Sequence, residues 1–163
     1  MFKALRDFLE QLPHLADPDP QAVERALQRA AAVMLAEVMR ADATVRPVER
    51  DAVHRALREQ FALSADEAVD LAEQATRTAA QSTDLFEFTS LVDAHLDMGQ
   101  KIRIVEHMCR VAYADGTLSD HERHILWRIA DLLHVPQAAY VHARTRARQA
   151  AQETQPKPAP AGR

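Results

Sequence analysis

Two pairs of carboxylates recur at the same separation in two parts of the chain. Asp115 and Glu122 are seven residues apart, and so are Asp42 and Glu49. In each pair we expect the aspartate at the end of one helix and the glutamate in the first turn of the next, where it can face back toward the aspartate. Carboxylate oxygens are the ligands that Ca²⁺, Mg²⁺ and Mn²⁺ prefer in proteins. The spacing therefore predicts an acidic divalent-cation site at Asp115 and Glu122, helped by Asp42 and Glu49.

The pair Asp115 and Glu122 lies in a segment that matches the second half of an EF-hand loop. From Asp115 to Glu122, Gly116 stands at the sharp turn and Ser119 stands where such a loop supplies a further oxygen. The first half of the loop does not match, because Val111 and Tyr113 occupy the places of its first two carboxylates. An ordinary EF-hand is therefore not expected, and only a smaller site with hard oxygen ligands remains.

A simpler interpretation of these residues needs no cation. Ser119 and Glu122 fit a capping box, in which the two side chains satisfy backbone N–H groups at a helix start. Asp115 could then be a solvated turn residue. The repeated spacing favours the cation, because capping explains neither Asp115 nor Asp42. Ala43 follows Asp42 at the place where glycine follows Asp115. The pair Asp115 and Glu122 is therefore the stronger candidate for a cation site.

Apolar residues at helical spacing predict the elements that position these carboxylates. We expect about seven main helices. Capping and proline signals mark several of their starts, such as the Ser64–Glu67 capping box and Pro47 at a first helical position. The expected helices cover roughly residues 21–39, 47–61, 65–80, 84–96, 99–112, 120–133 and 136–150.

The chain divides into three parts and contains an internal repeat. Residues 1–20 read as a short amphipathic helix and a proline-rich linker, residues 21–150 as a helical domain, and residues 151–163 as a disordered tail. A first unit, about 30–63, and a second unit, about 103–135, share the order helix, Ala-Asp turn, and Glu-Arg in the next helix. Neither unit alone can bury its apolar stripe. We therefore predict an all-α bundle with two pseudosymmetric helix-turn-helix repeats.

Composition excludes several classes of protein. With 3 glycines and 5% aromatic residues in 163, the chain does not suit a β-sandwich or barrel, and it contains neither a P-loop nor a dinucleotide fingerprint. No organic cofactor is therefore expected. The net charge is −4: the segment 136–163 is net basic but the rest of the chain is acidic and lacks a broad basic face, so a nucleic-acid partner is not expected. A single cysteine and the absence of a long apolar run favour a cytoplasmic protein without a transmembrane segment.

Other side chains with chemical potential have simpler interpretations. His121 and His124 are three residues apart, whereas zinc helices of the HExxH type place their histidines four apart. Cys109 lies in an apolar stripe and is predicted to be a core thiol. Trp127 is interpreted as an anchor between helices. No catalytic triad or paired-acid signature can be assigned.

The sequence around the second carboxylate pair resembles a known family. The run from Val111 to Glu122, followed by the run from Arg128 to Pro136, is similar to the TerB family, the tellurite-resistance B type. The segments 37–42 and 61–68 resemble its first repeat more loosely. The resemblance covers about residues 25–145 and implies an all-helical bundle with two pseudosymmetric halves. It also implies an acidic cluster suspected of binding divalent cations, a role that Asp115, Glu122, Asp42 and Glu49 would inherit.

The family is also similar to the N-terminal domain of DnaJ-like membrane co-chaperones. This chain has neither the His-Pro-Asp tripeptide of a J-domain nor a membrane anchor, so that activity is not expected. The expectation is a non-enzymatic bacterial protein of the cytoplasm that binds a divalent cation and acts as a sensor or scaffold in stress (tellurite or metal) resistance. Its partner would be an unidentified protein, which could belong to a membrane complex.

Two alternatives remain open from the residues alone. The first is a metal-free adaptor that binds a protein through an apolar groove or through the basic C-terminal helix. The second is a hydrolase whose cleft would contain titratable groups with perturbed pKa values. The residues leave the oligomeric state open.

Overall fold

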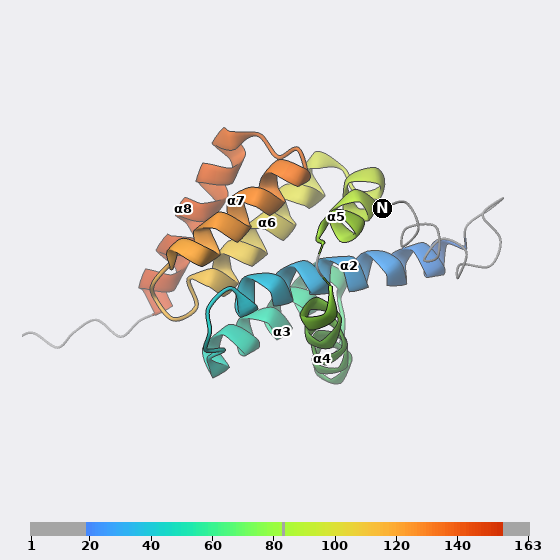
Figure 1. The fold of residues 1–163 in the computed structure, drawn as a ribbon, viewed down its shortest axis with the longest axis horizontal. Coiled ribbons are helices and arrows are strands. Elements are labelled where there is room, and N and C mark those ends of the chain that lie inside the picture. Colours follow the sequence, from blue (N-terminus) through green and yellow to red (C-terminus); the bar gives the residue numbers. More distant parts are fainter. Residues whose placement is uncertain (1–18, 83, 155–163) are drawn as a thin grey trace, which may run out of the picture.

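The described part of the chain is entirely helical. The structure is a computed structural model that describes residues 19–82 and 84–154. Within these residues it contains seven helices and no strand, so the predicted all-α bundle is confirmed (Figure 1). The predicted N-terminal helix, in residues 1–18, and residues 155–163 of the predicted tail lie outside the described residues. The helices are α2 (Pro20–Arg40), α3 (Pro47–Phe61), α4 (Ala65–Gln81), α5 (Phe86–His95), α6 (Met98–Ala112), α7 (Asp120–Leu132) and α8 (Gln137–Thr154).

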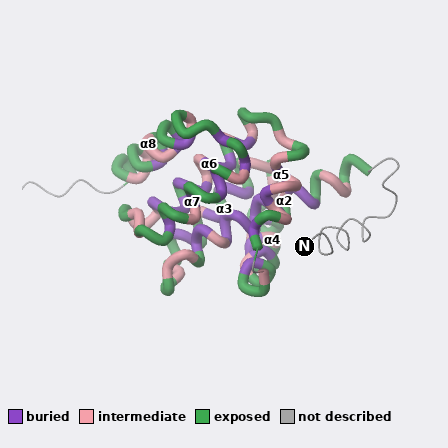
Figure 2. Tube along the Cα trace, turned by 45° about the horizontal axis from the view of Figure 1, so that its top comes forward, coloured by how far each residue is buried: buried purple, intermediate pink, exposed green. Residues whose placement is uncertain are grey.

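Helix α2 runs through the middle of the molecule. The α3–α4 pair lies on one side of it and the α5–α8 group on the other (Figure 1). All seven residues from Ala30 to Ala36 are buried, since this run is apolar on every side of the helix. Figure 2 shows the buried positions along α2 and on the faces of the helices that surround it. The end of α2 is thereby fixed, and the turn that carries Asp42 follows directly.

Helix α4 contacts α2 through a stripe of alanines. Its buried residues are Ala68, Ala72, Ala75 and Ala79, which recur every three or four positions and share one face. Side chains this small allow two helices to approach closely. The start of α4 has the predicted capping box: the Glu67 N–H donates to Ser64 Oγ at 3.2 Å, and the Ser64 N–H donates to Glu67 Oε1 at 3.4 Å.

The packing of helices α6 and α7 holds the turn between them in place, as the packing of α2 and α3 holds the turn between those two helices. Large side chains on both helices are fully buried, among them Ile104, Met108, Leu126 and Ile129. Helices α3 and α7 each end in a left-handed residue, Ala62 with φ of 53° and His134 with φ of 58°. These residues stand at matching places in the two predicted units, next to Leu63 and Val135.

Three local features refine the predictions. Helix α8 reaches Thr154, past the predicted end near residue 150, so residues 151–154 of the predicted disordered tail are helical. Ala151 packs against the core there, which explains the extension. Trp127 is 53% exposed, so its interpretation as an anchor between helices is wrong. Cys109 is fully buried as predicted, and burial raises the pKa of its thiol to about 12.

The helices also bear on membrane association. Among the described residues, no helix combines the length and the apolar character needed to cross a bilayer.

Candidate metal centre

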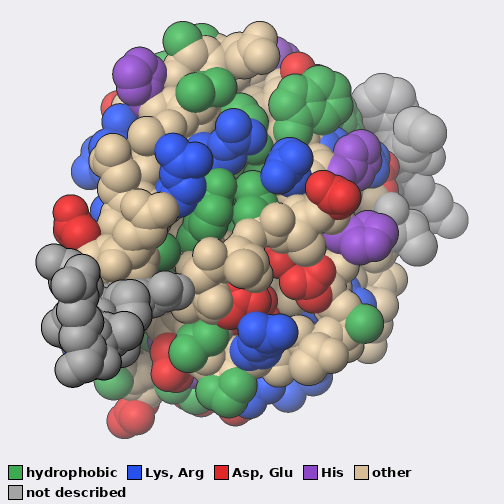
Figure 3. Space-filling view, turned by 90° about the vertical axis from the view of Figure 1, so that its left-hand side faces the viewer, with side chains coloured by type: hydrophobic (Ala, Val, Ile, Leu, Met, Phe, Trp, Pro, Cys, Tyr) green, Lys and Arg blue, Asp and Glu red, His purple; other side chains and the backbone are tan. Residues whose placement is uncertain are grey.

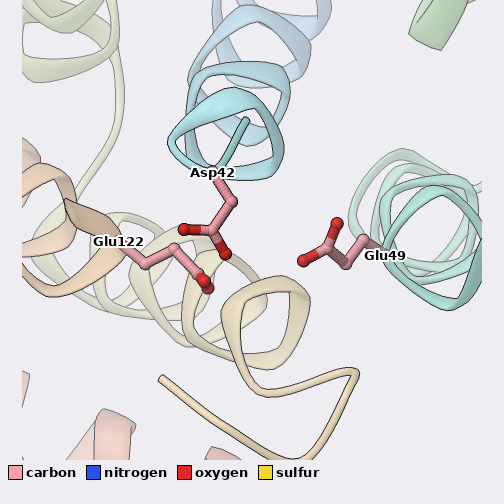
Figure 4. A group of neighbouring side chains, drawn as sticks. All are labelled: Asp42, Glu49 and Glu122. Atoms are coloured by element: carbon pink, nitrogen blue, oxygen red, sulfur yellow. The ribbon is translucent and has the colours of Figure 1, made fainter. Parts of the chain in front are cut away.

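Three of the four predicted carboxylates converge on one point. Asp42 follows α2, Glu49 lies in the first turn of α3, and Glu122 lies in the first turn of α7 (Figure 4). One carboxylate oxygen from each lies within 4.8 Å of the other two. Glu49 is 2% exposed and Glu122 is 1% exposed, whereas Asp42 is only partly buried. The group is thus lined by two buried glutamates and reaches the surface beside the aspartate.

Helix-start geometry orients Glu49. Arg46 precedes the first residue of α3, and its backbone N–H donates to Glu49 Oε2 at 2.9 Å. This is the glutamate half of a capping box. The turn between α2 and α3 is short, so the capped glutamate and Asp42 stay near each other.

Glu122 is oriented differently, and only the serine half of the predicted capping box forms at the start of α7. Ser119 Oγ accepts from the Glu122 N–H at 3.1 Å and donates to Glu122 Oε1 at 3.0 Å. The carboxylate does not complete the box on the Ser119 backbone. Instead, the side chain extends toward Asp42 (Figure 4). The other oxygen, Glu122 Oε2, is buried, and no group donates a hydrogen bond to it. Ionisation of Glu122 in this position costs free energy of folding unless a cation binds the oxygen, and protonation of the carboxyl avoids that cost.

The pKa shifts show how the group responds to crowding. Burial, together with the hydrogen bond and the charge of the neighbouring Asp42, raises the pKa of Glu122 to about 8. A hydrogen bond from Glu122 is the main cause that lowers the pKa of Asp42. Burial also raises the pKa of Glu49, as do the charges of Asp115 and Asp42. Near neutral pH, Glu122 therefore keeps a proton and donates it to ionised Asp42.

Asp115 lies beside this group but outside it. Its Oδ1 accepts from the backbone N–H of Thr117 at 3.0 Å and from the Thr117 hydroxyl at 3.3 Å. Its Oδ2 forms an ion pair with Arg46 Nη1 at 3.2 Å, and its side chain is 7% exposed. The structure therefore pairs Asp115 with Arg46 and does not bring it into the group that contains Glu122. Glu122 of the second unit meets Asp42 of the first, because the two units pack with their turns side by side.

Glycine at a turn does not decide which acidic residues lie in the group. Gly116 has φ of 88°, so the second turn needs its left-handed residue. Among the described residues only Ala62, His134 and Gly116 have positive φ, which leaves Ala43 in an ordinary conformation. The first turn thus forms without glycine, and both of its acidic residues join the group.

Sequence reasoning missed Arg46 and did not foresee the second role of Ser119. Ser119 both caps α7 and fixes one oxygen of Glu122. The signal was present, because Arg46 and Ser119 occupy corresponding places, each three residues before its glutamate. No histidine belongs to the potential metal-binding group found among the described residues.

The turns between α2 and α3 and between α6 and α7 face the same side of the molecule. They lie toward the left in Figure 1, and the view from that side shows acidic side chains reaching the surface next to basic ones (Figure 3). The centre is therefore accessible from one face of the bundle.

Comparison with known proteins decides the family. The family model described as tellurite resistance protein TerB matches residues 28–145. The chain belongs to the TerB family. The matched region of this TerB-family chain runs from α2 into α8 and contains all four predicted carboxylates. No curated protein matches the chain.

One solved structure supports the fold. The chain is similar to the crystal structure of a protein of unknown function from Porphyromonas gingivalis W83, with a TM-score of 0.53 and 22% sequence identity. The similarity covers 75% of this chain and 88% of that one. At this identity the likeness concerns the fold alone.

Proposed function

We propose that this TerB-family chain is a non-enzymatic protein that binds a divalent cation between Asp42, Glu49 and Glu122. The observation that carries the proposal is Glu122 Oε2, a buried carboxylate oxygen to which no group donates a hydrogen bond. It belongs to a group whose oxygens lie within 4.8 Å of one another. A cation in their midst would satisfy that oxygen and offset the repulsion among the carboxylates.

The donor set favours hard cations. All three ligands are carboxylates, which suits Ca²⁺, Mg²⁺ or Mn²⁺ better than metals that prefer nitrogen or sulfur. Water can complete the coordination shell on the partly exposed side of Asp42. Binding must displace the proton of Glu122, so affinity should fall as the pH is lowered below about 8.

The placement of the ligands suits a sensor or scaffold. Asp42 and Glu49 flank the turn of the first unit, and Glu122 opens α7 in the second. A bound cation would join the two units and stiffen the face that carries both turns. Family membership supports a role in tellurite or metal stress in a bacterial cytoplasm, through a protein partner that this face would contact.

Thermal unfolding of the chelated protein with added cations tests the proposal. Ca²⁺, Mg²⁺ or Mn²⁺ at 100 times its dissociation constant should stabilise the protein by about 2.7 kcal/mol, since it binds only the native state. The variant Asp42→Asn should lose this response. A matched variant, Asp120→Asn, changes a side chain that is 96% exposed in the first turn of α7 and should keep it. An equal response in both variants would place the cation elsewhere.

A metal-free adaptor is the second candidate, because one groove presents unusual apolar exposure. Trp127 is 53% exposed and Val141 is 41% exposed, and both line a groove between α7 and α8. Arg123 and Arg144 flank them, so an acidic protein segment with an apolar side chain would fit. Here the interaction of a purified partner should withstand a chelator and be lost in Trp127→Ala. Loss with the chelator alone would contradict the adaptor.

A further inference from the structure

Arg46 brings a positive charge to the edge of the carboxylate group. Its guanidinium pairs with Asp115 Oδ2 at 3.2 Å, while its own side chain remains 59% exposed. Its charge also contributes to the pKa values of Asp42 and Glu49, though less than the Glu122 hydrogen bond at Asp42 and burial at Glu49. The guanidinium therefore lies within electrostatic reach of two proposed ligands and in contact with a third acid.

We propose that Arg46 is a tethered competitor of the divalent cation. Its guanidinium pairs with Asp115 outside the centre, so the native centre binds a cation through three carboxylates only. The guanidinium also places a positive charge beside the centre, which lowers the affinity for the cation. This inference rests on the proposed function. It assigns to Arg46 the regulation of that site, a role that suits a sensor, because a weak site releases its ion when the concentration falls.

The environment of Asp115 supports this role. Its carboxylate is 7% exposed and depends on Arg46 for its only ion pair among the described residues. Its charge acts on Glu49, so it lies close to the centre. Without Arg46, the nearly buried carboxylate would lack a counter-charge, and a divalent cation bound at the neighbouring centre would supply one. Removing the Arg46 guanidinium therefore lowers its repulsion of an incoming cation. It also frees the Asp115 carboxylate to act as a fourth ligand.

The chain itself supplies the natural replacement. Ser119 occupies the corresponding place in the second unit, where it caps α7 and supports Glu122. The variant Arg46→Ser should therefore be compatible with a helix start and is expected to fold. Serine is the better N-cap, whereas loss of the ion pair with Asp115 acts in the opposite direction, so this change alters the stability of the cation-free protein on its own. The test must for that reason measure the dissociation constant rather than the melting temperature.

Isothermal titration calorimetry with Ca²⁺ and Mn²⁺ at pH 8 provides that measurement. Arg46→Ser should bind on the order of tenfold more tightly than the wild type. Arg46→Lys keeps the charge and should bind like the wild type. Arg50→Ser removes an exposed charge from the next turn position of α3 and should also bind like the wild type. A wild type that binds while Arg46→Ser gains no affinity would overturn the inference.

The double variant Arg46→Ser with Asp115→Asn tests the fourth ligand. If freed Asp115 joins the cation, the double variant should lose much of the gain seen in Arg46→Ser. A gain that persists in full would refute this part. Absence of binding in both the wild type and Arg46→Ser would reject the proposed function itself. Binding by Arg46→Ser alone would support Arg46 as a competitor and reject cation binding by the native chain.

Discussion

Replacing Glu122 with glutamine is expected to stabilise the cation-free protein at pH 8 and to abolish its response to divalent cations. Burial and Asp42 raise the pKa of this carboxyl to about 8, so the folded state opposes its ionisation. Glutamine has nearly the same shape, carries no charge, and can still accept the hydrogen bond from Ser119. It cannot supply the anionic oxygen that a cation needs. Stability and function should therefore change in opposite directions.

The pH window follows from the two pKa values of Glu122. In the unfolded chain the carboxyl has its ordinary pKa of 4.5, and in the folded protein its pKa is about 8. Below 4.5 both states are protonated, so the stability gained from the raised pKa is fully present. That stability is lost as the pH rises toward 8, by up to about 5 kcal/mol at roughly 1.4 kcal/mol per unit. Glu122→Gln should remove this loss.

Urea unfolding with a chelator at pH 5 and pH 8 provides the measurement. Variant and wild type should differ little at pH 5, and the variant should be more stable at pH 8. The matched control is Glu67→Gln, which changes an exposed glutamate at the third position of α4, the position that Glu122 has in α7. Its free energy of unfolding relative to the wild type should not increase between pH 5 and pH 8. A variant that is less stable than the wild type at pH 8 would contradict this view of Glu122.

Truncation of Leu126 is expected to cost about 2–5 kcal/mol of the free energy of unfolding. Leu126 is fully buried in the core on α7, one helical turn after Glu122. Leu126→Ala removes buried methyl groups and leaves a cavity that the surrounding helices can fill only partly. The midpoint of urea or thermal unfolding measures the loss.

The adjacent Trp127 supplies the control for Leu126. Although tryptophan is the larger side chain, it is 53% exposed, so Trp127→Ala should cost much less than Leu126→Ala. The reverse order would mean that α7 packs with a different face toward the core.

Much of the fold was predictable because local patterns and packing agree. The apolar run from residue 30 to 36 required burial on all sides, and α2 provides it. Pro47, the Ser64–Glu67 box and Pro136 each lie at or just before the first residue of a helix. The predictions were wrong where tertiary packing determines which side chains are buried and where a helix ends. Trp127 follows the apolar stripe of α7 closely enough to mislead, and α8 continues because Ala151 reaches the core.

The site was predictable in its residue types but not in its pairing. Spacing along the chain placed a glutamate seven residues after each aspartate. It could not show that Glu122 turns toward Asp42, because that contact depends on how the two units pack. It also could not show that Arg46 neutralises Asp115 across the units. Pairing is a tertiary property, whereas spacing reports only on the separate turns.

Crystals grown with Mn²⁺ offer the most direct test of the cation centre. Anomalous scattering identifies the metal and its position independently of any effect on stability. We expect one anomalous peak between the carboxylates of Asp42, Glu49 and Glu122, with oxygen ligands and with Asp115 still paired to Arg46. A structure without a peak among these three carboxylates, at a Mn²⁺ concentration that stabilises the protein in solution, would contradict the proposed centre.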